Sequence, residues 1–260
     1  MRKNQIIGLF DSGIGGLTLL RELVKILPKE NYIYYGDGKN CPLGNKSSQE
    51  VLKVTDNAIN HLVANGAKMV VIACNTASAI AKERLRAKYD IDIIAIEPAV
   101  KPALAATKSG IVGVLATRNT INSSPLKSLC ELWQEDKKVI LRPGDGLVEM
   151  VEKSTPLTAE DREVITSHIE ALIAKGADKI VLGCTHYPFL RDEMQQIIAN
   201  RQIEIIDPAP YVAIRAKDIL EKKGLLNTQS QNGKIIFTSS LNEEYNKTIE
   251  QKFLLLNSKA

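Results

Sequence analysis

The sequence predicts an α/β fold built from two related lobes, each with a parallel β-sheet. Short apolar runs alternate with longer amphipathic segments, glycine and small polar residues separate them, and the order of elements in the first half recurs in the second. Short buried runs between amphipathic segments are typical of βαβ units, in which helices cover both faces of a parallel sheet.

In the first half, apolar runs of strand length are followed by segments with helical periodicity. The expected strands are residues 6–10, 32–35, 69–73 and 91–96, and the expected helices are residues 17–27, 47–65 and 77–88. Gly66 follows the second of these helices, where a glycine commonly ends a helix.

The second half repeats this plan. Here the expected strands are residues 111–115, 139–141, 179–182 and 203–206, and the expected helices are residues 125–134, 158–175 and 188–199. The remaining chain predicts a helix at 211–223, a strand at 234–238 and a terminal amphipathic helix, with no counterpart between the lobes.

The two halves also align around their turns. The matching pairs are residues 66–76 with 176–186, 8–12 with 113–117, 35–37 with 143–145, and 97–98 with 207–208. A duplicated lobe is the economical interpretation, and chance similarity between strand–turn–helix units is the alternative. We expect a first lobe at residues 1–97, a second at 98–206, a C-terminal segment at 207–260 that packs back on the first, and an active site in the cleft between the lobes.

The composition is that of a soluble globular protein, with 44% apolar and 25% charged residues and a net charge of +4. No dense Lys/Arg block indicates nucleic-acid binding, and no apolar stretch approaches the roughly 18 residues that cross a bilayer. The start of the chain lacks the apolar segment of a signal peptide, so we expect a cytoplasmic protein. Four scattered cysteines and three histidines make a structural metal site improbable, and we expect no metal.

Two of the cysteines, Cys74 and Cys184, each end an apolar strand and come directly before a segment predicted to be helical. Ligands of open α/β sheets bind at the carboxyl ends of strands, and the N-terminus of a following helix stabilises negative charge. A thiol at such a position is expected to have a lowered pKa and to act as an acid or a base. The alternative for a single cysteine is a small buried hydrophobe.

The two thiols occupy matching positions in the repeat, so lobes that face each other would place them on opposite sides of one ligand. One group would then remove a proton from a carbon while the other delivers a proton to the opposite face, as stereoinversion requires. Cys41 and Cys130 have no such pairing, and we interpret both as structural.

Helix caps are expected beside both thiols. Asn75, Thr76 and Ser78 are suitable caps for the helix after Cys74, and Pro188 suits the first turn of the next helix after Cys184.

Three further side chains are candidates for proton handling. Asp11 lies in a glycine-rich turn that lacks a complete phosphate-binding motif, so we interpret it as a proton partner or ammonium contact, with a helix cap as the alternative. His186 follows Cys184 by two residues and is suited to exchange its proton, unless it is a hydrogen-bonded core histidine. Glu152 is a candidate for electrostatic support or a solvated helix carboxylate. Hydroxyls near strand ends are either caps or carboxylate ligands, namely Ser12, Thr76, Thr117 and Thr185.

These motifs resemble the glutamate racemase family of the aspartate/glutamate racemase superfamily. The matching segments are Gly8-Leu-Phe-Asp-Ser-Gly-Ile-Gly-Gly-Leu17, Tyr35-Gly36-Asp37, Pro42-Leu-Gly-Asn-Lys-Ser47, Ala73-Cys-Asn-Thr-Ala-Ser78, Ala116-Thr117 with Thr120, and Gly183-Cys-Thr-His-Tyr-Pro188. The resemblance implies interconversion of L- and D-glutamate without pyridoxal phosphate, metal or another cofactor, a role in peptidoglycan synthesis, and a homodimer.

The resemblance also implies site residues. Cys74 and Cys184 correspond to the acid/base pair, and Asp11 and His186 to their proton-handling neighbours. Substrate contacts are implied for Ser12, Leu43, Gly44, Asn75, Thr76, Thr117 and Thr185. Two positions depart from the family pattern, because Leu43 and Leu126 stand where the family usually carries tyrosine, and this bears on substrate preference.

Other functions fit parts of the pattern. The nearest alternative is an aspartate racemase. A single-thiol decarboxylase would need only one of the two cysteines, a non-catalytic amino-acid-binding protein would exchange no proton with solvent, and a redox protein would join the thiols in a disulfide.

Overall fold

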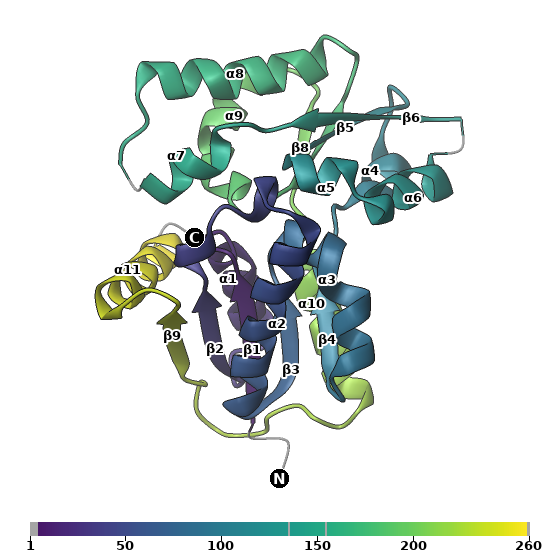
Figure 1. The fold of residues 1–260 in the computed structure, drawn as a ribbon. Coiled ribbons are helices and arrows are strands. Elements are labelled where there is room, and N and C mark those ends of the chain that lie inside the picture. Colours follow the sequence, from purple (N-terminus) through teal and green to yellow (C-terminus); the bar gives the residue numbers. More distant parts are fainter. Residues whose placement is uncertain (1–4, 135, 154, 259–260) are drawn as a thin grey trace. The chain divides into compact units, whose positions relative to one another are not determined.

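The computed structural model describes residues 5–134, 136–153 and 155–258, and its contacts divide the chain into two compact units. Unit 1 comprises Met1–Ile96 and Ala209–Ala260, and unit 2 comprises Glu97–Pro208. The first unit is therefore interrupted by the second and completed by the end of the chain (Figure 1).

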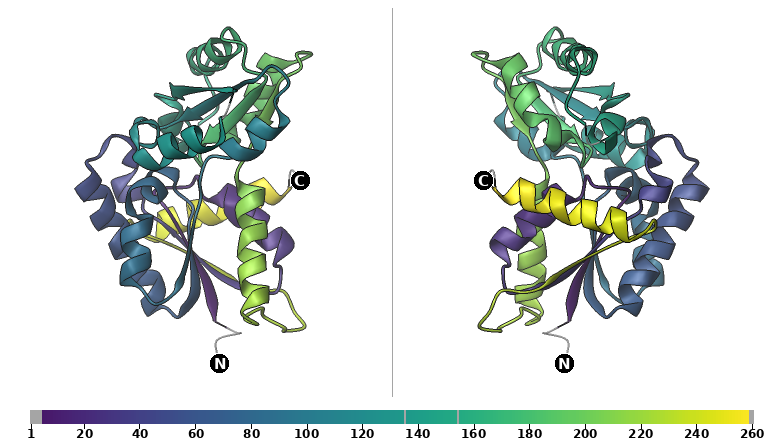
Figure 2. Two further views of the ribbon diagram at one scale, coloured as in Figure 1. Left: turned by 90° about the vertical axis from the view of Figure 1, so that its right-hand side faces the viewer. Right: turned by 90° about the vertical axis from the view of Figure 1, so that its left-hand side faces the viewer.

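The sheet of unit 1 has five parallel strands in the order β4-β3-β1-β2-β9. The strands are β1 (Ile6–Asp11), β2 (Asn31–Gly36), β3 (Ala67–Ile72), β4 (Asp92–Ala95) and β9 (Ile235–Ser239). One face is covered by α2 (Ser48–Ala64) and α3 (Asn75–Lys88), and the other by α1 (Leu17–Ile26), α10 (Ala209–Lys222) and α11 (Glu243–Ser258), as Figures 1 and 2 show. The turns η2 (Gly38–Asn40) and η3 (Leu43–Asn45) join β2 to α2.

The sheet of unit 2 has four parallel strands in the order β6-β5-β7-β8. They are β5 (Ile111–Ala116), β6 (Lys138–Pro143), β7 (Lys179–Gly183) and β8 (Glu204–Ile206). The helices α8 (Ala159–Ile173) and α9 (Arg191–Ile198) pack together on one face, and α4 (Val100–Ala106) packs with α6 (Ser124–Trp133) on the other (Figure 1). The short α5 (Arg118–Asn122), α7 (Leu147–Lys153) and η4 (Tyr187–Leu190) lie in loops that follow strands.

The strand orders of the two units superimpose if β1, β2, β3 and β4 are equated with β5, β6, β7 and β8. Glycines at the same position of β1 and β5 serve the same packing. A Cβ at Gly8 would lie 3.0 Å from Leu62 of α2, and a Cβ at Gly113 would lie 3.0 Å from Leu172 of α8. The absence of a side chain lets each helix approach its sheet closely. The predicted α/β fold of two parallel-sheet lobes is confirmed.

The equivalent helices α2 and α8 begin and end alike. Ser47 and Thr158 each form a capping box with the acidic residue three positions later. Beyond their C-termini, Gly66 and Gly176 have φ angles of +82° and +88°, a conformation that glycine adopts without steric cost.

The predicted helix at 188–199 is wrong in its first turn. Residues Tyr187–Leu190 form a 3₁₀ turn, and the α-helix begins only at Arg191. The N–H groups of Tyr187 and Phe189 donate to carbonyls three residues earlier, at Cys184 and His186, which tightens the chain after β7. Cys184 is therefore followed by a 3₁₀ turn and not by the N-terminus of an α-helix. The helices α4, α5 and α7 were not predicted, since each spans only two turns or fewer.

The C-terminal segment is tied to the rest of unit 1 by an ion pair in its interior. The Lys68 ammonium lies 2.6 Å from the Glu30 carboxylate, and both side chains are almost fully buried. Lys68 also donates to the carbonyl of Leu225, and the other Glu30 oxygen accepts the N–H of Asn227. These bonds fix the segment between α10 and β9, and β9 then extends the sheet beside β2.

Candidate active site

Cys74 lies at the carboxyl edge of the unit 1 sheet, between β3 and α3. It is itself the N-cap residue of α3, and its side chain is buried. The Cys74 thiol donates a hydrogen bond to the Ser12 hydroxyl at a sulfur–oxygen distance of 3.6 Å. Ser12, which was predicted as a substrate contact, is therefore in contact with Cys74, although the two residues are 62 positions apart in the chain.

The predicted caps of this helix are inside it instead. Asn75, Thr76 and Ser78 belong to α3, and the Ser78 hydroxyl donates to the carbonyl of Ile72. Asn75 is 3% exposed, and neither its amide oxygen nor its amide nitrogen has a hydrogen-bond partner among the residues that the structure describes. Buried polar groups are nearly always paired, so this amide is suited to bind a polar ligand.

Asp11 ends β1 and is fully buried. One carboxylate oxygen accepts the N–H of Gly13 at 3.0 Å, which stabilises the turn before α1. Asp11 does not cap α1, because the N-cap residue of that helix is Gly16. A Cβ at Gly16 would lie 2.7 Å from the Asp11 Cβ, so the glycine-rich turn makes room for the carboxylate.

The loop after β2 contributes a carboxylate that the sequence analysis did not select. Asp37 is 3% exposed, donates its N–H to the Asp11 carbonyl, and accepts a bond from the Asn40 amide. Its other carboxylate oxygen, Oδ1, has no hydrogen-bond partner within the described ranges of the chain. The available signal was the alignment of residues 35–37 with 143–145, which placed Asp37 at a strand end.

The predicted contacts Leu43 and Gly44 are buried in η3. The Leu43 side chain belongs to the apolar core that also contains Phe10, Val51 and Cys74. Leu43 is therefore a core residue of unit 1.

Cys184 lies at the carboxyl edge of the unit 2 sheet, directly after β7, and is buried. Its sulfur lies 3.8 Å from Nδ1 of His186, and Nε2 of His186 lies 2.6 Å from a carboxylate oxygen of Glu152. Because a carboxylate accepts, Nε2 donates its proton to Glu152, which leaves Nδ1 facing the thiol. Unit 2 thus contains a thiol–imidazole–carboxylate chain that can move a proton to and from sulfur.

The remaining predicted residues of unit 2 occupy a helix cap, the segment after β7 and the apolar core. Thr117 is the N-cap residue of α5, where its hydroxyl accepts the N–H of Thr120. Thr185 is buried between Cys184 and His186. Leu126 packs in the apolar core of unit 2.

Cys130 belongs to the same apolar core, and burial raises the pKa of its thiol to about 11. Cys41 is partly exposed in the loop between the turns η2 and η3 of unit 1.

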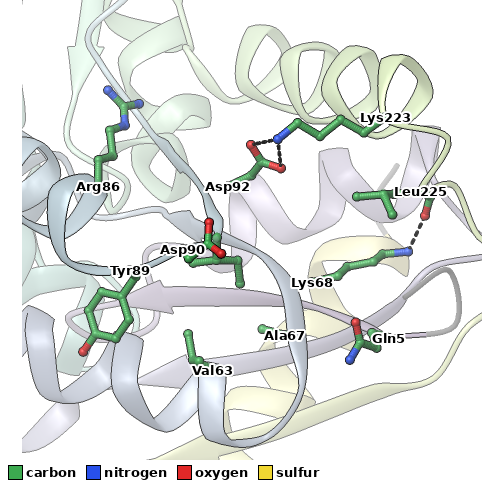
Figure 3. Close-up of a pocket in the computed structure, with 11 residues that line it drawn as sticks. Gln5, Val63, Ala67, Lys68, Arg86, Tyr89, Asp90, Asp92, Lys223 and Leu225 are labelled. Carbon is green, nitrogen blue, oxygen red and sulfur yellow. Dashed lines mark hydrogen bonds and ion pairs between the residues drawn. The ribbon is translucent and has the colours of Figure 1, made fainter. Parts of the chain in front are cut away.

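A cavity of about 450 Å³ lies elsewhere in unit 1 (Figure 3). It is lined by residues at the amino ends of β3 and β4, so it lies at the opposite edge of the sheet from Cys74. Figure 3 shows the Lys223 ammonium reaching both carboxylate oxygens of Asp92, and Lys68 donating to Leu225. Asp92 is bonded to Lys223, and Lys68 is paired with the buried Glu30. We assign no ligand to this cavity.

The fold and site together define a class of protein: an α/β protein with two units of the same strand order, which carries a cysteine after the third strand of each unit. The Asp/Glu/hydantoin racemase family model matches residues 7–216. A glutamate racemase from Clostridium novyi is 42% identical over 250 residues, which cover 95% of this chain and 96% of the relative.

Solved structures agree with this match. A glutamate racemase isoform from Bacillus anthracis superimposes with a TM-score of 0.88 at 33% identity, over 97% of this chain and 94% of that one. A glutamate racemase from Francisella tularensis, solved with D-glutamate, has a TM-score of 0.83 at 30% identity over the same shares. The chain belongs to the Asp/Glu/hydantoin racemase family, and it is an isomerase.

Proposed function

We propose that this protein interconverts L- and D-glutamate by transferring protons between the substrate α-carbon and two thiols, Cys74 and Cys184. Each of these thiols is buried at the carboxyl edge of its own sheet, where the Cys74 thiol bonds the Ser12 hydroxyl and the Cys184 sulfur faces the His186 imidazole, which can accept a proton. This observation carries the proposal. The substrate is assigned from relatives that are named glutamate racemases, one of them solved with D-glutamate.

In this mechanism, one cysteine acts as a thiolate and takes the α-proton, so the C–H bond breaks and its electron pair remains on a planar carbon. The opposite thiol gives its proton to the other face of the carbon, whose electron pair forms the new C–H bond. Its S–H bond breaks, and the bonding electrons remain on sulfur as a thiolate. The two cysteines have then exchanged protonation states. One cysteine is the base when L-glutamate reacts, and the other is the base when D-glutamate reacts. His186 and Glu152 return the Cys184 sulfur to its starting protonation state.

Stabilisation of the intermediate requires hydrogen bonds directed at the substrate carboxylates. We assign this task to the buried Asn75 amide and the N–H groups at the start of α3. Ser12, Gly44, Thr76, Thr117 and Thr185 complete the proposed substrate contacts. Asp11 is proposed to handle a proton on the Cys74 side.

A chiral assay tests the activity. Purified protein, given L-glutamate without added cofactor in D₂O, should form D-glutamate that carries deuterium at the α-carbon. Cys74→Ser and Cys184→Ser should each abolish net racemisation. The control is Cys130→Ala, which removes a third buried thiol from the apolar core of unit 2 and should retain racemisation. A protein that binds glutamate without incorporating deuterium, or a serine variant with the unaltered rate, contradicts the proposal.

The same assay with both aspartate enantiomers tests substrate preference. Leu43 and Leu126 are core residues in the structure, so we propose that they leave the preference for glutamate unchanged. A kcat/KM for aspartate that exceeds that for glutamate would overturn this assignment and favour an aspartate racemase.

We also propose that the protein acts in the cytoplasm as a homodimer and supplies D-glutamate for peptidoglycan. None of the helices in the described residues could span a bilayer. Large apolar side chains are exposed on two helices that both pack against α1, namely Tyr211 and Ile214 on α10 and Leu254 and Leu255 on α11. Sedimentation equilibrium tests the dimer, and rescue of a bacterial D-glutamate auxotroph tests the role.

A further inference from the structure

The turn between β6 and α7, residues Gly144, Asp145 and Gly146, is held by side chains from two other elements. The Tyr187 hydroxyl of η4 donates to the Gly144 carbonyl at 3.1 Å. Nε2 of His168, on α8, bonds the next carbonyl, that of Asp145, also at 3.1 Å. This turn leads directly into α7, the short helix that carries the Glu152 carboxylate to His186.

The hydrogen bonds of His168 determine its protonation state. Arg142 of β6 donates its Nε–H to Nδ1 of the imidazole at 3.0 Å, and a guanidinium cannot accept a bond. The carbonyl of Asp145 can only accept, so the proton is on Nε2 and the ring is neutral. Burial lowers the pKa of His168 and is the largest cause. The bond to the Asp145 carbonyl and the Asp145 charge oppose this shift, and the Arg142 charge adds to it. The imidazole is therefore a fixed donor toward the turn.

Tyr187 connects the same turn to the segment that holds the imidazole of His186. It is fully buried, and burial raises the pKa of its hydroxyl well above the usual value, so the hydroxyl remains a donor. A Cβ at Gly144 would collide with this hydroxyl, so only glycine fits here. Gly144 also donates its N–H to the Ala116 carbonyl at the end of β5.

We propose that His168 is a positioning residue for racemisation, because with Tyr187 it fixes the turn from which α7 presents Glu152 to His186. The side chains of His168 and Tyr187 bond carbonyls of this turn, so we infer that they act on Cys184 through Glu152. This inference rests on the proposed function, in which His186 serves the Cys184 thiol.

The test uses three substitutions at His168 and Tyr187 and one control, each in the full-length protein. His168→Phe removes both bonds, His168→Gln keeps an amide N–H for the turn, and Tyr187→Phe removes only the hydroxyl. The control is Arg162→Gln, on the same helix, which breaks an exposed ion pair with Glu193. Glu152→Gln serves as the reference for loss of the carboxylate.

The informative measurement is the primary deuterium isotope effect on kcat/KM with α-deuterated L- and D-glutamate. The equilibrium constant of a racemisation is one, so kcat/KM is the same in both directions and cannot identify the impaired thiol. A slower proton transfer at Cys184 should raise the isotope effect for one enantiomer and lower it for the other. A general loss of folded protein changes neither value.

We expect His168→Phe to lower kcat about ten-fold, as small misplacements of catalytic groups do. Its isotope effects should change for the same enantiomers and in the same directions as those of Glu152→Gln. Tyr187→Phe should show the same pattern more weakly, and His168→Gln should remain within about two-fold of the unaltered rate.

Two outcomes separate failure of this inference from failure of the proposed function. If Glu152→Gln and Cys184→Ser impair racemisation but His168→Phe and Tyr187→Phe behave like Arg162→Gln, the positioning role is wrong. If Cys184→Ser retains full activity, the two-thiol function itself is wrong. If the His168→Phe protein unfolds at a much lower temperature, the isotope effects of Tyr187→Phe decide instead. Unchanged isotope effects in Tyr187→Phe then also overturn the inference.

Discussion

Equivalent positions of the duplicated scaffold carry different residues, and these differences distinguish the two thiols. Asp11 ends β1, whereas the equivalent residue at the end of β5 is Ala116. Conversely, His186 stands two residues after Cys184, where the first repeat has Thr76 after Cys74. The Cys74 thiol bonds the Ser12 hydroxyl, whereas the Cys184 sulfur faces the His186 imidazole, so the two cysteines have different surroundings in the proposed mechanism.

Asn75 provides a first prediction at this scale. Its buried amide makes no bond to described residues, so replacing it by alanine removes an unsatisfied group. We expect Asn75→Ala to leave the unfolding free energy within about 1 kcal/mol of the original or to raise it. Its kcat/KM for glutamate should fall ten- to a hundred-fold, by roughly the 1.5–3 kcal/mol of a hydrogen bond to a charged group. Urea unfolding measures the free energy and the chiral assay measures kcat/KM. A large stability loss with an unchanged kcat/KM would contradict this prediction.

Cys130 provides a second prediction. A thiol pKa of about 11 leaves about a hundred-fold less thiolate at pH 8 than the usual value of 9 does, and the side chain is buried. We expect iodoacetamide to leave Cys130 unmodified in the folded protein and to modify it in urea. Peptide mass spectrometry measures both, and fast modification of folded protein would disagree.

The sequence predicted the positions of both thiols, because a strand end followed by a helical segment recurs in the two repeats. It did not predict the bonds that these thiols make. Ser12 reaches Cys74 because β1 and β3 are neighbours in the sheet, which depends on strand order. Glu152 reaches His186 from α7, a helix of seven residues that is too short for its periodicity to be recognised.

At the scale of elements, most boundaries followed from local signals. Capping residues and glycines with positive φ begin and end α2 and α8 where the sequence suggested. The exception after β7 arises from bonds between residues three apart, which helical periodicity does not distinguish from a first α-helical turn. The parallel direction of the strands was also implied by the alternation of strands and helices, whereas the pairing of β9 with β2 depends on tertiary contacts.

The buried ion pair that fastens the segment after α10 gives a third prediction. Lys68→Met leaves the Glu30 carboxylate buried without its cation, which typically costs about 3–5 kcal/mol. In the double variant Lys68→Met with Glu30→Gln, the amide is neutral and its oxygen still accepts the Asn227 N–H. We therefore expect the double variant to regain part of the lost unfolding free energy, measured in urea. A double variant less stable than the single one would show that the pair is not the cause.

At the scale of the whole molecule, unit 2 is continuous in sequence and unit 1 is not. The described part of unit 2 has its own four-stranded sheet and apolar core. Unit 1 requires α10, β9 and α11 from the end of the chain to cover α1 and the outer edge of β2. The two units therefore differ in whether they can fold from one uninterrupted stretch.

This difference gives a fourth prediction. A fragment of residues 97–208 should fold alone, with a cooperative thermal transition and dispersed amide resonances. A fragment of residues 1–96 should not, because β2 would keep an unpaired edge and α1 an uncovered apolar face. Circular dichroism and ¹H–¹⁵N spectra compare the two fragments. A well-folded 1–96 fragment would show that the C-terminal return is dispensable.

The return of the chain to its first sheet has a consequence for synthesis on the ribosome. Domains generally fold as they emerge, from the N-terminus onward. Here β1 and β2 must wait for β9, which is synthesised after the whole of unit 2, while the inserted unit can mature in the meantime. The nascent chain thus holds an incomplete sheet edge from the synthesis of β2 until that of β9, and chaperones that bind exposed strands can bind β2 during this interval.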